Sequence, residues 1–315
     1  MSKDRSIPKP AAKGSVSKEP TRKVSGRPAG LLTWLAVGVV LVVVMALIVI
    51  KIFSGGPTSS TNSGRWEATD PTTVAQITQI PPHVYNEVGI TGSGQVTAPV
   101  ALKSQPLLTA KLADGKTVPE IIYIGAEYCP FCAAQRWTTI AALSRFGTWK
   151  GLGNTESSSV DKFANTPTFT FLKASFSSPY LVFKGVEELN NVYNSYTNPP
   201  YGQLMKPTKF EQQIFAKFDT SNYINMSPSD DGSIPFITMG NQFLVSGASY
   251  DPGLLSGLTR TQIASNLSAT IDPISRVIIT SANEQTAAIC KLTHQQPRNV
   301  CASSGVMSAK KLMKL

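Results

Sequence analysis

The sequence has only four cysteines and two histidines among its 315 residues, so few side chains could bind a transition metal. A structural zinc site needs four ligands, usually two closely spaced cysteine pairs or cysteines with histidines nearby. Cys129 and Cys132 form one such pair, but Cys290 and Cys301 have ten residues between them. Covalent haem attachment needs a histidine directly after the second cysteine, and Ala133 stands there. These absences exclude c-type haem and disfavour zinc, and we expect neither a metal nor an organic cofactor.

A concentrated basic region is also absent from the middle of the chain. The formal net charge is +10, but residues 1–30 hold eight lysines and arginines against two acidic residues. Lys51 and three lysines among the last six residues supply the other four positive charges, which leaves residues 52–309 formally neutral. Since a nucleic-acid-binding surface needs clustered positive charge, we expect no nucleic-acid partner.

One long apolar run is present, and it extends from Leu31 to Ile50 with Thr33 as its polar exception. At about 1.5 Å per residue, a helix of this length spans roughly 30 Å, the thickness of the hydrocarbon core of a bilayer. A cleavable signal peptide usually has a shorter apolar region followed by a small-residue cleavage site, so a retained anchor is favoured. We predict a transmembrane helix over residues 30–52, with the membrane contacted by residues 31–50.

The charges around this run predict its orientation and divide the chain into parts. Positively charged flanks stay on the cytoplasmic side, so residues 1–29 should form a basic cytoplasmic tail. Residues 53–81, which contain SGGPTSSTNSG, have the composition of a flexible linker. Residues 82–303 are long enough for one extracytoplasmic domain with its own core, and residues 304–315 are expected to be a tail. The prediction is a single-pass protein of the cell membrane.

A strand pattern meets a helix pattern at the closely spaced cysteines. Ile121 to Ile124 is a continuous apolar run rich in β-branched residues, which is typical of a strand buried on both faces. After Cys129 apolar residues recur at helical spacing, and Pro130 suits the first helical position. We therefore expect Cys129 at a helix N-terminus and Cys132 one turn further along the same face.

The remaining domain shows further strand and helix patterns. Strands are predicted at 166–175 and 179–186, an amphipathic helix at 208–218, a hairpin from the segments IPFITMG and QFLVSGA, and helices at 259–267 and 272–292. Residues 190–203 are polar and rich in turn formers, which predicts a long loop or insertion.

The order strand, CxxC, helix, strand, helix, hairpin, helix resembles the thioredoxin-like fold over about residues 119–267. AEYCPFC is similar to thioredoxin active-site segments, and the Pro-aromatic pair between the cysteines is similar to glutaredoxins. The segments IGAEYCPFCAAQRW, NTPTF and ICKLT are similar to an uncharacterised family of membrane-anchored thioredoxin-like proteins from archaea and actinobacteria. The resemblance implies an α/β fold, with a central mixed sheet flanked by helices, an insertion and a C-terminal helical extension.

The CPFC pair suits thiol-disulfide exchange. The thiolate is the reactive form of cysteine, and the unpaired N–H groups and dipole of a helix N-terminus lower a thiol pKa. Cys129 is therefore the expected nucleophile, and Cys132 would resolve the mixed disulfide by forming Cys129–Cys132. A purely structural disulfide within the CxxC is the alternative.

Residues next to the motif are candidates for proton handling and substrate contact. Glu127 stands where thioredoxins also carry an acid, and it either raises the thiol pKa, relays protons or is simply solvated. Tyr128 and Phe131 flank the nucleophile as candidate substrate contacts, and Phe131 should affect how exposed the pair is. Thioredoxins bury an acid six positions before the first cysteine, but Tyr123 stands there, so proton handling is expected to differ.

The resemblance also implies a cis-proline opposite the CxxC, and the matching residue is Pro235. The backbone of Ile234, directly before it, would pair with a substrate strand by β-addition. Cys290 and Cys301 are expected to form a disulfide that pins the last helix, worth roughly 2–3 kcal/mol, in an oxidising exterior. A second redox pair that passes electrons to CPFC is the alternative.

Together these features predict a membrane-tethered, extracytoplasmic thiol-disulfide oxidoreductase. Its partners would be cysteine-containing exported proteins and an unidentified redox partner. The sequence leaves open whether it oxidises, reduces or isomerises their cysteines. The alternative is a redox-inert thioredoxin-like binding or scaffold module of the cell envelope, because a fold does not by itself establish an activity.

Overall fold

The computed structural model describes residues 66–224 and 226–315. The predicted cytoplasmic tail, the predicted transmembrane helix and the first part of the predicted linker lie outside the described residues. Within the described ranges, no helix combines the length and the apolar character needed to cross a membrane.

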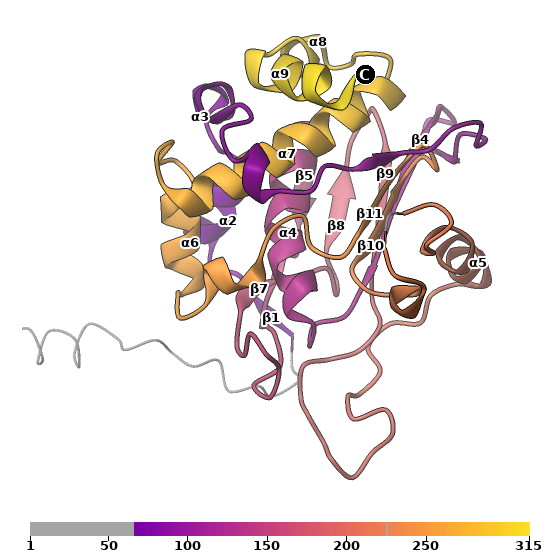
Figure 1. The fold of residues 1–315 in the computed structure, drawn as a ribbon, viewed down its shortest axis with the longest axis vertical. Helices are drawn as coiled ribbons and strands as arrows, with labels where there is room; N and C mark the ends of the chain where they lie inside the picture. The colour runs from indigo at the N-terminus through magenta and orange to yellow at the C-terminus, as the bar shows by residue number, and fades with distance from the viewer. Residues whose placement is uncertain (1–65, 225) are drawn as a thin grey trace, which may run out of the picture. The chain divides into compact units, whose positions relative to one another are not determined.

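A mixed sheet lies at the centre of the domain, with β4 (Thr117–Gly125) as its central strand (Figure 1). β4 pairs in parallel with β9 (Val182–Glu187) and antiparallel with β10 (Phe236–Met239). The other strands of this sheet are β11 (Phe243–Ser246) beside β10, β2 (Val100–Ala101) beside β11, and β3 (Thr109–Lys111) beside the start of β4. Every residue of β4 after Thr117 is buried, as the continuous apolar run predicted.

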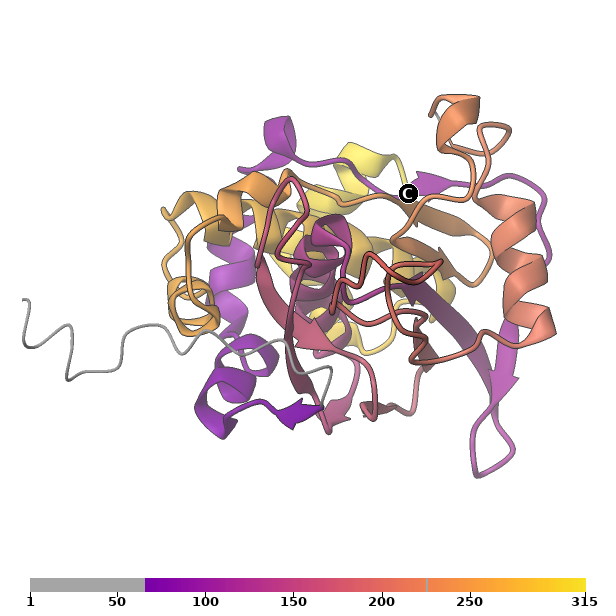
Figure 2. The same ribbon diagram turned by 90° about the horizontal axis from the view of Figure 1, so that it is seen from below.

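Helices cover both faces of this sheet, because the side chains of β4 alternate between two cores. Ile121 and Tyr123 belong to the core shared with α4 (Pro130–Leu143) and α7 (Pro273–Leu292). Ile122 and Ile124 belong to the core shared with α5 (Lys209–Phe218). Figures 1 and 2 show α5 across the sheet from α4 and α7. The expected α/β fold with a central mixed sheet flanked by helices is confirmed.

Local sequence signals explain where the main helices begin. Cys129 is the N-cap of α4 and Pro130 occupies its first turn. Thr208 and Glu211 form a capping box at the start of α5, and Asp272 accepts hydrogen bonds from two backbone N–H groups at the start of α7. The predicted helices at 208–218 and 272–292 and the hairpin of β10 and β11 are therefore confirmed.

Four short strands occupy the segment between α4 and β9, and one of them pairs with a strand near the start of the described residues. Two small antiparallel sheets are present, and their strands are β1 (Glu67–Ala68), β6 (Gly153–Glu156) and β7 (Pro167–Thr170) in one, and β5 (Thr148–Lys150) and β8 (Ser175–Ser177) in the other. The single strand predicted over 166–175 is wrong, since β7 ends at Thr170 and β8 begins at Ser175. The two strands belong to different sheets, which the β-branched composition of the segment does not reveal.

Both predicted ends of the domain are wrong. The predicted linker, 53–81, contains β1 and α2 (Pro71–Thr78), whose Ile77 is fully buried. The predicted tail, 304–315, contains α9 (Ser304–Met313), which buries Val306 and packs against α3 (Pro82–Val88) and α7. Each of these helices is short, with eight and ten residues, and is stabilised by its contacts with the rest of the core.

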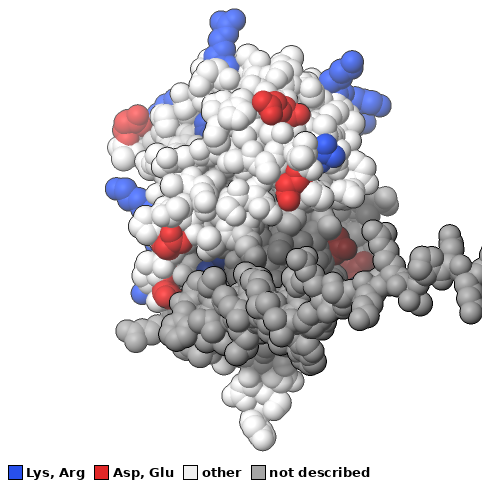
Figure 3. All heavy atoms as spheres, turned by 90° about the vertical axis from the view of Figure 1, so that its left-hand side faces the viewer, with Lys and Arg blue, Asp and Glu red and all other residues white. Residues whose placement is uncertain are grey.

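The other described elements are α6 (Arg260–Asn266), α8 (Arg298–Cys301) and the 3-10 turns η1 (Ser93–Gln95), η2 (Pro228–Asp230) and η3 (Pro252–Leu255). Figure 3 shows the side of the molecule at the left of Figure 1, where charged side chains of both signs are scattered over the described surface. No large area of one charge is visible on this described face, in keeping with the neutral composition of the domain.

Candidate functional site

The CPFC cysteines lie where the central strand passes into α4. Cys129 caps the helix, and its Sγ accepts a hydrogen bond from the backbone N–H of Cys132 at 3.3 Å. Both thiols are free; Cys129 is 5% exposed and Cys132 is fully buried. The predicted position of Cys129 at a helix N-terminus is confirmed, and of the pair only Cys129 reaches the surface.

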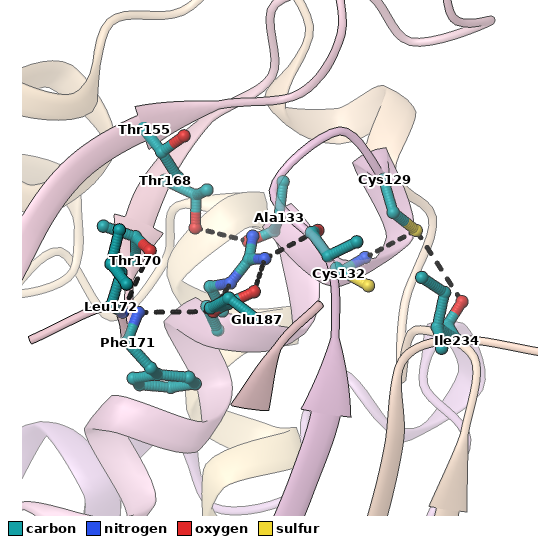
Figure 4. A network of polar contacts seen from close by, with 12 residues as sticks. Cys129, Cys132, Ala133, Thr155, Thr168, Thr170, Phe171, Leu172, Glu187 and Ile234 are labelled. Atoms are coloured by element: carbon teal, nitrogen blue, oxygen red, sulfur yellow. Dashed lines mark hydrogen bonds and ion pairs between the residues drawn. The ribbon is translucent and has the colours of Figure 1, made fainter. Parts of the chain in front are cut away.

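Ile234 and Pro235 lie beside Cys129, although they are more than 100 residues away in sequence. The peptide bond between them is cis, as expected, and it directly precedes β10. The Cys129 Sγ lies 3.7 Å from the carbonyl oxygen of Ile234, close enough for the thiol to donate to it (Figure 4). The antiparallel pairing of β10 with β4 places this segment next to the cysteine.

The two thiols differ in acidity because their surroundings differ. Hydrogen bonds to its sulfur, first from the Cys132 thiol and then from backbone N–H groups, lower the pKa of Cys129 despite its burial, and the charge of Arg136 adds to this. Burial, followed by the neighbouring Cys129, raises the pKa of Cys132 well above its ordinary value. Cys129 is therefore the thiol that ionises first, which suits it to be the nucleophile.

A buried ion pair, Arg136–Glu187, lies behind the dithiol. Arg136 of α4 is fully buried, and it donates from Nε (2.8 Å) and Nη2 (2.5 Å) to the two carboxylate oxygens of Glu187 at the end of β9. Its Nη2 also donates to the carbonyl oxygen of Ala126 at 2.7 Å. The backbone N–H of Phe171 donates to Glu187 Oε1 at 3.2 Å, so the carboxylate is held from two sides (Figure 4).

Sequence reasoning did not identify either member of this pair. A signal for Arg136 is present, because it is the one charged residue of α4 and stands four residues after Cys132. No comparable signal marks Glu187, whose partner is 51 residues away in sequence.

Glu127 is buried rather than solvated at the edge of a loop, so the solvated interpretation is wrong. It is 7% exposed, and burial raises the pKa of its carboxyl, opposed by hydrogen bonds with Thr170 and Thr155. Its backbone N–H donates to the carbonyl of Leu189 at 2.9 Å, which holds the residue against the segment that follows β9. The carboxyl therefore lies in the same polar interior as Arg136 and Glu187, whose charges also affect its pKa.

Tyr123 occupies the position where thioredoxins bury an acid. It is fully buried, and burial raises its pKa well above the ordinary value, so the phenol stays neutral. The Arg136 Cζ lies 5.8 Å from the centre of its ring, and its hydroxyl has no hydrogen-bond partner among the described residues. The ionisable carboxyls of this interior are thus Glu127 and Glu187, which stand elsewhere in the fold.

Aromatic side chains from the insertions surround the dithiol. Phe131 is 42% exposed and meets Phe163 edge to face with 6.2 Å between ring centroids. Tyr128 stacks on Tyr201 at 4.3 Å, and the hydroxyl of Tyr201 donates to Ser158 Oγ. The predicted substrate contacts, Tyr128, Phe131 and the half-buried Ile234, therefore all lie around Cys129. The loop with Phe163 was not assigned to the site by sequence reasoning.

Cys290 and Cys301 form the predicted disulfide, which joins the end of α7 to α8. Both residues are buried, at 0% and 2% exposed, and their Cα atoms are 5.6 Å apart. A second redox pair would have to offer a sulfur to a partner, so this burial favours the structural interpretation.

The fold and the site define an α/β protein with a free CxxC dithiol at the start of a helix and a cis-proline beside it. The chain belongs to the family described as a domain of unknown function (DUF929), which matches residues 107–291. The matched region includes CPFC, the Arg136–Glu187 pair and Pro235. No curated protein and no solved structure matches the chain.

Proposed function

We propose that this protein is a thiol-disulfide oxidoreductase with a thioredoxin-like fold. The observation that carries the proposal is the position of the Cys129 sulfur. It caps α4, accepts a hydrogen bond from the backbone of Cys132, and lies 3.7 Å from the carbonyl before the cis-proline. An N-cap thiol of lowered pKa beside a second thiol has what disulfide exchange requires.

The order of the elements supports the thioredoxin-like assignment. β4 leads through CPFC into α4, β9 follows in parallel, α5 covers the opposite face, and the antiparallel hairpin of β10 and β11 comes next. The helix α6 completes the order that the sequence resemblance implies, and α7 begins the C-terminal helical extension. The strands β5 to β8 lie between α4 and β9, in addition to the insertion expected at residues 190–203.

The proposed exchange proceeds in two steps. The Cys129 thiolate attacks one sulfur of a substrate disulfide, so that a mixed disulfide forms and the other substrate sulfur leaves as a thiolate. The Cys132 thiol then loses its proton and attacks the Cys129 sulfur, which forms Cys129–Cys132 and releases the second substrate thiolate. Two electrons pass to the substrate, and the reverse sequence oxidises it. Glu127 is the proposed acceptor of the Cys132 proton, because its buried carboxyl lies in the same interior.

Substrate binding is proposed along the edge of Ile234. Its backbone N–H has no hydrogen-bond partner among the described residues, so an extended substrate segment could pair with it. Tyr128 and Phe131 would contact the residues on either side of the substrate cysteine. The proposed partners are cysteine-containing exported proteins, together with a redox partner that restores the starting state.

We also propose that the domain is tethered to the cell membrane and faces the outside. The apolar run from Leu31 to Ile50 and the basic residues before it support this topology. The Cys290–Cys301 disulfide adds support, since structural disulfides are typical of oxidising compartments. Labelling by a membrane-impermeant thiol reagent in intact cells tests the topology, and protection of a cysteine introduced at an exposed domain position would contradict it.

Insulin reduction and reactivation of scrambled ribonuclease test the activity. We expect wild type to turn over at least one of the two substrates and Cys129→Ser to lose on the order of 10³-fold, as expected for the loss of a nucleophile. The Cys290→Ser/Cys301→Ser variant is the control, because it removes the two disulfide-bonded cysteines, far from CPFC in sequence, and leaves both free thiols in place. Equal turnover by wild type and Cys129→Ser would contradict the proposal.

A trapping experiment separates the enzyme from the alternative binding module. Cys132→Ser cannot resolve a mixed disulfide, so it should accumulate covalent adducts with exported proteins that dithiothreitol releases. Partners that bind Cys129→Ser and wild type equally, without any reducible adduct on Cys132→Ser, would favour the redox-inert module.

A further inference from the structure

Packing of the core does not by itself require a buried guanidinium at Arg136. Removing an arginine and a carboxylate from water costs several kcal/mol per ion, and apolar residues of similar volume often stabilise a core equally well. The Arg136 Nη1 has no hydrogen-bond partner among the described residues, so this side chain is not fully satisfied even with Glu187 beside it. A charge kept in the interior under these conditions calls for a reason other than stability.

The position of Arg136 connects it with the dithiol. It stands one turn after Cys132 on α4, and its Nη2 donates to the carbonyl oxygen of Ala126. The same carbonyl oxygen of Ala126 accepts a hydrogen bond from the backbone N–H of Cys129, with 3.4 Å between nitrogen and oxygen. The guanidinium therefore contacts the turn that leads into the nucleophile, as well as the helix that follows it.

The two charges of the ion pair are not equivalent with respect to the sulfurs. Glu187 lies on the side of Phe171, which donates to it, whereas Cys132 and Cys129 lie on the other side of the network (Figure 4). The positive charge of Arg136 contributes to lowering the pKa of both thiols. The dithiol thus faces the cationic end of the pair.

The other titratable groups around this interior are Glu127 and Tyr128, from the turn before Cys129, and Tyr123, from β4. Burial raises the pKa of all three groups. Tyr123 carries no charge that could offset Arg136, and Glu127 is hydrogen-bonded with Thr155 and Thr170. Glu187 remains the main countercharge, and its removal should strengthen the effect of Arg136 on the sulfurs.

We propose that Arg136 is a positioning residue whose charge stabilises the reduced, thiolate-containing dithiol, so that the Cys129–Cys132 disulfide oxidises substrate thiols. This inference rests on the proposed exchange activity, and it adds the direction in which electrons flow, from the substrate to the protein. A substrate thiolate attacks the Cys129 sulfur and Cys132 leaves as a thiolate; a second substrate thiolate then attacks the bound substrate sulfur and Cys129 leaves. The substrate gains a disulfide, the protein gains two electrons, and a small-molecule disulfide such as oxidised glutathione can restore it.

The wild-type protein provides the first test. It is equilibrated in a glutathione buffer poised between the reduction potentials of thioredoxin and protein disulfide isomerase, and the free thiols are counted by mass spectrometry after acid quenching. We expect Cys129 and Cys132 to be mostly in the dithiol form. A pair that is mostly disulfide in this buffer overturns the proposed direction, and no variant needs to fold for that result.

Two variants at the ion pair test the role of the charge. Glu187→Gln leaves Arg136 without its countercharge, and we expect the equilibrium constant for oxidation by glutathione at pH 8 to fall about fivefold. Arg136→Met/Glu187→Gln removes both charges, and we expect that constant to rise about fivefold above wild type, which is about 20 mV for a two-electron couple. The Cys129 pKa, measured from the pH dependence of alkylation, should fall in the first variant and rise in the second.

Arg145→Met is the control for the loss of a hydrogen-bonded guanidinium from a half-buried arginine. Arg145 follows α4 and bonds to Asn283, Thr286 and Ser303 rather than to residues near the dithiol. We expect this variant to lose stability while its equilibrium constant with glutathione stays within twofold of wild type. A purely structural role for Arg136 predicts no opposite shifts in the two ion-pair variants.

The outcomes separate this inference from the proposed function. If wild type exchanges with glutathione but both ion-pair variants keep its equilibrium constant, the inference about Arg136 is wrong and the exchange activity stands. If wild type does not exchange with glutathione at all, the proposed function fails. Arg136→Lys keeps the positive charge but forms fewer hydrogen bonds. A reduction potential of this variant close to that of wild type supports an electrostatic role of Arg136, even if the double variant does not fold.

Discussion

The two cysteine pairs of this protein differ in bonding and in their position on a helix. Cys129 and Cys132 are free thiols at the start of a helix, next to a cis-proline and a buried arginine. Cys290 and Cys301 are joined in a disulfide where the end of α7 meets α8, and both are buried. The helix N-terminus favours a thiolate, whereas the end of α7 offers carbonyl groups and no such stabilisation.

The comparison shows that spacing alone does not separate a reactive pair from a structural one. A cysteine pair is suited to exchange when the thiolate of one member is stabilised by its surroundings, and it is structural when its sulfurs are joined and lack such stabilisation. In this protein the difference comes from which end of a helix each pair occupies and from what the rest of the chain packs against it.

The largest expected effect concerns the stability of the second pair. Cys290→Ala/Cys301→Ala removes a cross-link between residues 11 positions apart, and the chain-entropy model predicts a loss of about 3 kcal/mol. For a domain of this size the melting temperature should fall by about 5–10 °C. Under reducing conditions Cys129→Ala/Cys132→Ala should lower the free energy of unfolding by less than half as much, because it removes no cross-link. Equal losses in the two variants would remove the distinction between the pairs.

The helix that carries Cys290 should also determine much of the pH dependence of stability. Burial raises the pKa of Glu284 on α7 to about 7, and its carboxyl lies in the core at 1% exposed. Because the folded pKa is raised above the ordinary carboxyl value, stability is highest at acidic pH and is lost as pH rises from about 4.5 to about 7. Glu284→Gln should match wild type near pH 4.5 and be more stable by about 2–3 kcal/mol at pH 8. Urea unfolding at both pH values measures this, and an equal difference at the two would contradict it.

A smaller effect concerns the reactivity of the two thiols of CPFC. In the reduced protein at pH 7, iodoacetamide should modify Cys129 at least tenfold faster than Cys132, because thiolate character and exposure both favour Cys129. Peptide mapping over time measures the two rates. Comparable rates of modification would show that the position of Cys129 at the helix N-terminus does not make it more reactive than Cys132.

The smallest effect concerns the aromatic residues around the nucleophile. Phe131→Ser removes a ring that is 42% exposed, and we expect kcat/KM for a cysteine peptide with apolar flanking residues to fall about two- to fivefold. Tyr196→Ser is the control, since Tyr196 is 97% exposed in the loop after β9 and forms no aromatic stack with the site. If the control reduces kcat/KM as much as Phe131→Ser, the ring at Phe131 has no specific role in substrate contact.

Much of the fold could be predicted where a local pattern coincides with a long buried element. The apolar run of β4, the capping of α5 and α7 and the hairpin of β10 and β11 all depend on neighbouring residues in the chain. The short elements α2, α9, β5, β6 and β8 could not be predicted, because each is stable only against distant segments that its own sequence does not indicate.

The residues of the candidate site also fall into those that the sequence indicates and those that depend on distant segments. The CPFC pair and Pro235 stand out by residue type and order, but the buried state of Glu127 depends on the loops that cover it. The Arg136–Glu187 pair depends on β9 lying parallel to β4, which brings the end of that strand next to α4. Tyr201 reaches Tyr128 only because the loop after β9 folds back over the motif.

The sequence by itself determined which thiols are present, that Cys129 caps a helix, and that a central strand leads into it, because these features depend on hydrogen bonds and periodicity within a few residues. Only the tertiary structure decided which groups surround the sulfurs. A carbonyl 105 residues away lies next to the Cys129 sulfur, and a carboxylate 51 residues away holds the arginine behind the motif. Electrostatic effects act through space, so the acidity of a thiol depends on the packing of the whole domain.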